Sequence, residues 1–136
     1  SDVYKRQILD IIVKGGQKMI RFYQYQNCTT CKKAAKFLDE YGVSYEPIDI
    51  VELNPNKREL QDIIDKTGVE IDKLFNKRGG KYRELGLKDR LDSLSDDEKL
   101  DLLASDGMLV KRPLAVSGNK ITLGFNEKEY KDTWVN

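Results

Sequence analysis

Three features, in chain order, predict an α/β protein. A strand–helix–strand unit comes first, a stretch dominated by helices follows, and two strands with a last helix close the sequence. The first unit predicts two parallel strands joined by a right-handed crossover. No internal repeat or second domain boundary interrupts this order. We therefore expect one domain over residues 19–136, with a helical insert at about 54–105.

The composition narrows the class of function. Hydrophobic residues make up 39% of the chain and charged residues 35%, which is typical of a folded globular protein. No apolar run approaches the roughly 20 residues that a membrane span needs. The net charge of +1 gives no bulk attraction to nucleic acid or a membrane, and we expect neither as a direct partner. Because the chain has no histidine, Ser-His-Asp triads, Cys-His pairs and His-containing metal sites are excluded.

Residues 1–18, "SDVYKRQILDIIVKGGQK", lack the architecture of a signal peptide. Residues 14–19 can be encoded by a purine-rich ribosome-binding sequence followed directly by a start codon. We therefore expect 1–18 to be a non-native leader made from translated upstream DNA. The alternative is a genuine N-terminal arm.

The first unit can be followed residue by residue. Residues 19–25 alternate apolar side chains in a β-rich run, which predicts a strand. A helix is predicted over 29–41, ended by Gly42. A second strand is predicted over 43–50, and Pro47 within it indicates a sheet edge or a bulge.

The middle of the chain predicts three helices. The first begins at the cap formed by residues 54–56 and ends at Gly68. A short helix is predicted over 69–75. The third begins at the capping box of residues 95–98.

Strands are predicted at residues 114–116 and 120–123. The short Ser-Gly-Asn connection between them favours an antiparallel hairpin. Asn126 is predicted to cap a last helix.

The stretch "QNCTTCKKAAKFL" holds the only two cysteines, Cys28 and Cys31. Three interpretations are open: a redox pair, half of a metal site, or buried packing. A structural zinc site takes four ligands from Cys and His, and this chain offers two, so no metal is expected. Two cysteines at this spacing do not form a secreted disulfide scaffold, and we therefore expect the protein to be located in the cytoplasm.

The redox interpretation rests on the position of Cys28 at the expected helix start. Free backbone N–H groups and the positive end of the helix dipole favour a thiolate there, and Lys32 and Lys33 add positive charge. Cys31, three residues further on, is placed to attack a mixed disulfide on Cys28 and release the product. A reversible Cys28–Cys31 couple with Cys28 as the nucleophile is therefore predicted.

Arg112 and Pro113 form a second candidate group. A proline directly before a strand in such a fold predicts a cis peptide bond that presents backbone to a substrate, although a plain strand-start proline is the alternative. Arg112 can offer a bidentate fork to an oxyanion or carboxylate, or be a surface charge. Asn27 and Thr29 flank Cys28 and are predicted to contact the substrate too. We expect the basic cluster at 77–83 to be a solvated face.

The motifs "YQYQNCTTCKKA", "ELQDIIDKTGVEIDKLFN", "KYRELGL", "LDLLASDGMLVKRPLAV" and "GFNEKEY" resemble the ArsC/Spx family of thioredoxin-like proteins. The likeness covers residues 19–134 and is nearest to uncharacterised arsenate reductase-like members with a CxxC. It implies a thioredoxin-like βαβ-ββα core with an inserted helical subdomain.

The resemblance also implies site residues. In the arsenate reductases of the family one cysteine attacks arsenate and three arginines hold the oxyanion; Cys28 matches that cysteine and Arg112 one arginine. Asn76 stands at the second position and Gly124-Phe125 near the third, and the alternative is that Arg78 or Lys77 substitutes for a missing arginine. Because a charge-assisted contact contributes about 1.5–3 kcal/mol, we expect arsenate to bind weakly here.

Two kinds of protein are implied. One is a cytoplasmic, monomeric oxidoreductase without a cofactor, which takes electrons from glutathione with glutaredoxin, or from thioredoxin. The other is an Spx-type transcriptional regulator that binds RNA polymerase and uses the CxxC as a redox switch. The glycine of the polymerase-facing segment in that branch is not matched in register, since Gly68 is displaced and Glu70 lies nearer its place.

Overall fold

The computed structural model describes residues 13–14 and 17–135. The leader expected over residues 1–18 therefore falls largely outside the described residues. Within it, β1 (Val13–Lys14) and β2 (Gln17–Lys18) pair antiparallel with each other, apart from the main sheet.

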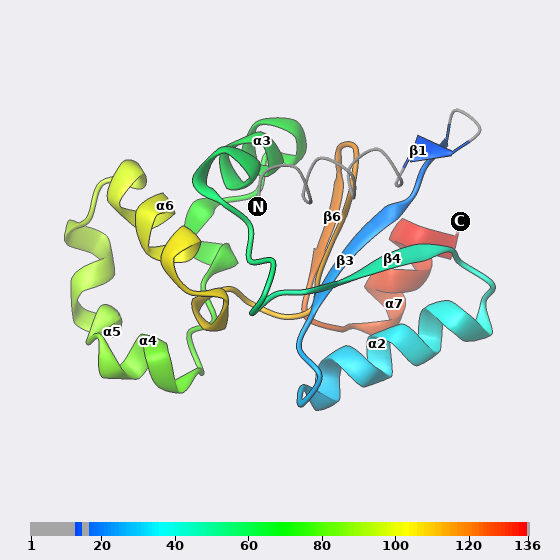
Figure 1. Ribbon diagram of the computed structural model, residues 1–136, viewed down its shortest axis with the longest axis horizontal. Helices are drawn as coiled ribbons and strands as arrows, with labels where there is room; N and C mark the ends of the chain where they lie inside the picture. Colours follow the sequence, from blue (N-terminus) through cyan, green and yellow to red (C-terminus); the bar gives the residue numbers. More distant parts are fainter. Residues whose placement is uncertain (1–12, 15–16, 136) are drawn as a thin grey trace.

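The centre of the molecule is a four-stranded mixed sheet in the order β4-β3-β5-β6 (Figure 1). Its strands are β3 (Ile20–Gln24), β4 (Tyr45–Asp49), β5 (Leu114–Ser117) and β6 (Lys120–Leu123). β3 and β4 are parallel, while β5 pairs antiparallel with both β3 and β6. β4 is an edge strand, as Pro47 predicted.

One face of the sheet is covered by α2 (Thr29–Glu40) and α7 (Glu127–Tyr130), the latter continued by a π-helical turn over Lys131–Val135. Strand residues alternate between faces, so Phe22 points to this side. It packs with Leu38 of α2 and Tyr130 of α7. The predicted cap at Asn126 is confirmed, because its side chain accepts the Glu129 N–H at 2.9 Å.

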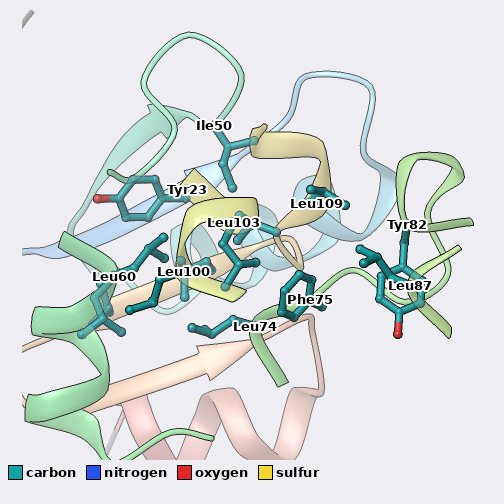
Figure 2. Close-up of a cluster of buried hydrophobic side chains, with 14 of the residues drawn as sticks. Tyr23, Ile50, Leu60, Leu74, Phe75, Tyr82, Leu87, Leu100, Leu103 and Leu109 are labelled. Atoms are coloured by element: carbon teal, nitrogen blue, oxygen red, sulfur yellow. The ribbon is translucent and has the colours of Figure 1, made fainter. Parts of the chain in front are cut away.

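The other face is covered by α3 (Lys57–Thr67) and α6 (Asp96–Ser105). Figure 2 shows the cluster on this side, where Tyr23 of β3 meets Leu60 of α3 and Leu103 of α6. Both helices begin with complete capping boxes, which confirms the two predicted starts.

Shorter elements lie between and after these helices. They are the 3-10 turns η1 (Ile71–Leu74), η2 (Leu91–Ser93) and η3 (Gly107–Leu109) and the helices α4 (Gly80–Glu84) and α5 (Leu87–Arg90). The helix predicted over 69–75 is thus shorter than expected. The second strand is also shorter than predicted, Tyr45–Asp49 in place of 43–50.

A bridge between Phe75 and Val110 ties this helical region to the segment that enters β5. The observed order is βαβ, an insert of helices, then ββα, which confirms the predicted thioredoxin-like fold class. Among the described residues, no helix combines the length and apolar character that a bilayer crossing requires.

Gly107 of η3 packs closely against Ile50, the residue that follows β4, and a substitution at Gly107 tests this contact. A Cβ at this buried position would overlap the carbonyl oxygen of Ile50, a backbone atom that cannot rotate away. Gly107→Ala is expected to lower the free energy of unfolding by about 1–3 kcal/mol, as overpacking typically does. Urea denaturation measures this change. In the matched control, Gly80→Ala, the new methyl meets open space, so equal losses in both variants would contradict the close contact.

Candidate functional site

Cys28 is the N-cap of α2, at the junction where β3 ends (Figure 1). Its backbone N–H donates to the Tyr25 carbonyl at 3.0 Å, and its Sγ accepts the Cys31 N–H at 3.2 Å. The sulfur thus takes the role that a Ser or Asp oxygen has in most N-caps. The half-buried Cys28 thiol lies at the positive end of a 12-residue helix, as the sequence predicted.

Cys31 is one turn further along α2 and is 1% exposed. Burial raises the pKa of the Cys31 thiol to about 12, and the hydrogen bond with the Cys28 side chain acts in the same direction. A hydrogen bond from the Tyr25 backbone and the charge of Arg112 oppose these effects but are smaller. In the dithiol state Cys31 is therefore a protonated, shielded thiol at neutral pH.

Cys28 is half-buried, and the first turn of its helix adds no negative charge beside it. The first turn of α2 has no acidic residue, and Lys32 and Lys33 are exposed. Asn27 and Thr29, the predicted substrate contacts, are exposed on either side of Cys28. The Asn27 amide donates to the Tyr25 hydroxyl at 3.4 Å.

The Arg112–Pro113 peptide bond is cis, as predicted from the sequence. Pro113 is buried, and its carbonyl accepts the Gly124 N–H at 3.0 Å. These contacts fix the backbone at the start of β5, the strand next to β3. Arg112 is thereby brought to the same end of the sheet as Cys28.

The Arg112 side chain is half-buried and is not a free surface charge. One terminal nitrogen donates to the Met108 and Val110 carbonyls at 3.3 and 3.4 Å. Its guanidinium carbon stands 5.5 Å from the centroid of the Tyr25 ring, a cation–π distance. The Nε is buried and has no hydrogen-bond partner among the described residues, so it is an unsatisfied donor at this end of the sheet.

Tyr25 is a site residue that the sequence reasoning missed. Its carbonyl holds Cys28, its backbone contacts Cys31, its hydroxyl accepts from Asn27, and its ring supports Arg112. The available signal was an aromatic residue at the end of a strand, three positions before a helix-capping cysteine.

The other two anion-binding positions implied by the family resemblance also lie beside Arg112. Asn76 donates its backbone N–H to the Leu109 carbonyl at 2.7 Å, and Gly124 bonds to Pro113. Neither residue carries a charge. The Lys111 side chain reaches this place, since its Cε is 3.3 Å from where a Cβ on Gly124 would stand.

Other features of the described chain lie apart from the cysteines. A cavity of about 860 Å³ at the opposite end of β3 is lined by residues that include Met19, Arg21 and Gly118, and neither cysteine reaches it. No group of three or more acidic or cysteine side chains among the described residues is arranged to hold a metal ion.

The sheet order, the cysteine at the start of the first core helix and the facing cis-proline define a thioredoxin-like protein. The chain belongs to the ArsC family, whose pattern matches residues 23–133. This confirms the family resemblance of the sequence motifs.

The chain is similar to three proteins, the first of which has a solved solution NMR structure. SACOL0876 from Staphylococcus aureus COL is 73% identical, with a TM-score of 0.82, over 87% of this chain and 100% of that chain. The uncharacterized protein YusI of Bacillus subtilis is 49% identical over 116 residues, 85% of this chain and 98% of YusI. The global transcriptional regulator Spx of Streptococcus agalactiae is 27% identical over 113 residues, 83% of this chain and 81% of Spx.

The difference between the two thiols can be measured by alkylation across a pH series. In a Cys28→Ser variant, the rate at Cys31 should stay low through pH 8 and still rise above pH 10. The physical reason is that burial raises the pKa of Cys31 to about 12, so the thiolate forms only in strong base. The matched Cys31→Ser variant should label faster at pH 7–8, because Cys28 is more exposed. Faster labelling of Cys31 would contradict the assignment.

Proposed function

We propose that this protein is a thiol–disulfide oxidoreductase that uses Cys28 as its nucleophile and Cys31 as its resolving thiol. The observation that carries the proposal is the N-cap geometry: the Cys28 sulfur accepts an N–H bond at the open end of α2 while Cys31 is buried one turn away. Backbone donors at a helix N-terminus stabilise a thiolate, and the thiolate is the attacking form.

The reaction has two exchanges. The Cys28 thiolate attacks one sulfur of a substrate disulfide, forms a mixed disulfide and expels the other sulfur as a thiolate, which takes a proton from water. Cys31 then loses its proton to solvent and attacks the Cys28 sulfur, which releases the second substrate thiol. The substrate gains two electrons, and the protein is left with a Cys28–Cys31 disulfide.

A donor thiol must then reduce this disulfide. Glutathione with glutaredoxin, or thioredoxin, is the donor class that the family suggests, and we place the cycle in the cytoplasm, where such donors keep thiols reduced. We propose that the protein acts as a monomer and needs no cofactor.

Arsenate is not the substrate we favour. Of the three anion-binding arginine positions, this chain keeps Arg112, while Asn76 and Gly124 supply no charge. Lys111 near Gly124 adds one cation without the planar fork of arginine. A disulfide with a single anionic group suits a site with one arginine better than an oxyanion that is held by three.

A trapping variant tests the mechanism. Cys31→Ala should accumulate a mixed disulfide on Cys28 when treated with oxidised glutathione, whereas the native chain should close its internal disulfide. Intact-protein mass spectrometry distinguishes the two products. The control, Cys28→Ala, should form neither at a comparable rate. An adduct that appears chiefly on Cys31 would refute the assigned roles.

Arg112→Lys tests the role of Arg112 in anion binding. The variant keeps the charge but loses the fork, so the reduction of oxidised glutathione, which carries carboxylates, should slow by about tenfold to a hundredfold. Reduction of neutral bis(2-hydroxyethyl) disulfide serves as the control and should change much less. Equal losses with the two disulfides would show that Arg112 only supports the fold.

A second candidate is a redox-switched transcriptional regulator. The observation that supports it is the 27% identity with Spx over most of the chain. Here the same Cys28–Cys31 couple would control binding to RNA polymerase instead of turning over. The Cys31→Ala trap separates the candidates when used on a cell lysate: disulfide-linked substrates support the enzyme, while non-covalent, oxidation-dependent recovery of RNA polymerase supports the regulator.

A further inference from the structure

Positive and negative charges are segregated along this chain. Residues 20–38, 73–83 and 107–126 contain no Asp or Glu, so all 23 acidic residues lie in the rest of the chain. The same three segments hold half of the 24 basic residues. The net charge of +1 therefore hides a strong local imbalance.

Contacts within the fold join these three segments to one another, and the first of them carries Cys28. Residues 20–38 form β3 and α2 with Cys28 between them. The Lys111 N–H donates to the Leu74 carbonyl at 2.8 Å, and the Phe75–Val110 bridge lies alongside, which joins the second segment to the third. The Arg112–Tyr25 contact joins the third to the first.

We define the basic rim as six cationic residues of these segments: Lys32, Lys33, Lys77, Arg78, Lys111 and Arg112. All are exposed except the half-buried Arg112. The ion pairs found in the described part of the chain use Lys57, Lys66 and Lys99, on α3 and α6. None of them involves a residue of the basic rim, so its charge is not neutralised by salt bridges within the described residues.

We propose that the basic rim selects acidic protein disulfides, that is, proteins with Asp or Glu beside the cystine that Cys28 attacks. This inference rests on the proposed oxidoreductase function and names its substrate class. The chemical step is unchanged: the Cys28 thiolate joins one substrate sulfur, the other leaves as a thiol, and Cys31 releases the first. The rim raises the rate of encounter, because like-signed charges around a site attract an opposite partner over about one Debye length, roughly 8–10 Å.

Two observations favour a protein over other anions. The rim is built from mostly exposed residues of three separate segments, so a partner must be extended to meet all of it. The thiol exchange also requires a sulfur in the partner, which nucleic acid lacks.

The test uses three peptide disulfides that are identical except for two flanking residues, which are glutamate, glutamine or lysine. Each rate of reduction by the reduced protein is divided by the rate of the same peptide with dithiothreitol, which removes differences in intrinsic reactivity. At low ionic strength the glutamate peptide should react about tenfold or more faster than the lysine peptide. The ratio should fall toward one as salt is added.

The double variant Lys77→Glu/Arg78→Glu should lose most of this preference, measured as the rate with the glutamate peptide divided by the rate with the glutamine peptide. The matched control, Lys128→Glu/Lys131→Glu, changes two exposed lysines at the end of the chain and should keep the preference. The inference is overturned if the glutamine peptide is reduced but the glutamate peptide reacts no faster than the lysine peptide. It is also overturned if both double variants change the preference equally. In either case the proposed function stands. If no peptide is reduced, the proposed function fails and the inference fails with it.

Discussion

The hydrogen bond from the Cys31 N–H to the Cys28 sulfur is the interaction on which the site depends. It makes the Cys28 sulfur the cap of α2, and the same atom is the nucleophile of the proposed mechanism. The bond requires an extended backbone at Cys28, which its φ of −95° and ψ of 111° provide, and a strand that delivers the chain to this point. β3, held between β4 and β5, is that strand. The sheet therefore positions the sulfur, and the helix that starts there supplies the donors.

The two cysteines are made different by burial, not by sequence. Both are thiols three residues apart, yet Cys28 lies at the end of the helix and Cys31 points into the apolar layer between α2 and the sheet. Water can solvate a thiolate at the first position and not at the second, so the pKa of Cys31 is raised. In the proposed mechanism this asymmetry gives the pair a direction: Cys28 attacks the substrate, and Cys31 acts only once a mixed disulfide has formed.

Tyr25 and Arg112 connect this pair to the far part of the chain. Arg112 reaches the site because a cis peptide bond and the Pro113–Gly124 hydrogen bond fix the start of β5, and the Tyr25 ring then holds its guanidinium. The insert of helices is joined to this part of the chain by the Phe75–Val110 bridge, which attaches the 73–83 segment to the residues that precede Arg112. The insert thus does more than cover apolar strand residues.

Much of the architecture followed from local sequence patterns. The strands, the cap within residues 54–56, the capping box at Ser95 and the helix start at Cys28 were predicted because each depends on neighbours within a few residues. The ends of elements were less accurate: the helix expected over 69–75 is the 3-10 turn Ile71–Leu74. Hydrogen bonding in one short turn is set by what it packs against, which a local pattern does not contain.

For the site too, some properties could be read from the sequence and others are set only by the fold. The sequence by itself determined which groups are available: two cysteines, no histidine, one arginine before a proline, and three segments without an acidic residue. Only the tertiary structure decided that Cys31 is shielded, that Tyr25 lies under Arg112 and that contacts join the three basic segments. The reason is that burial and charge proximity arise between residues far apart in the chain, and the packing of the sheet and its helices sets their distances.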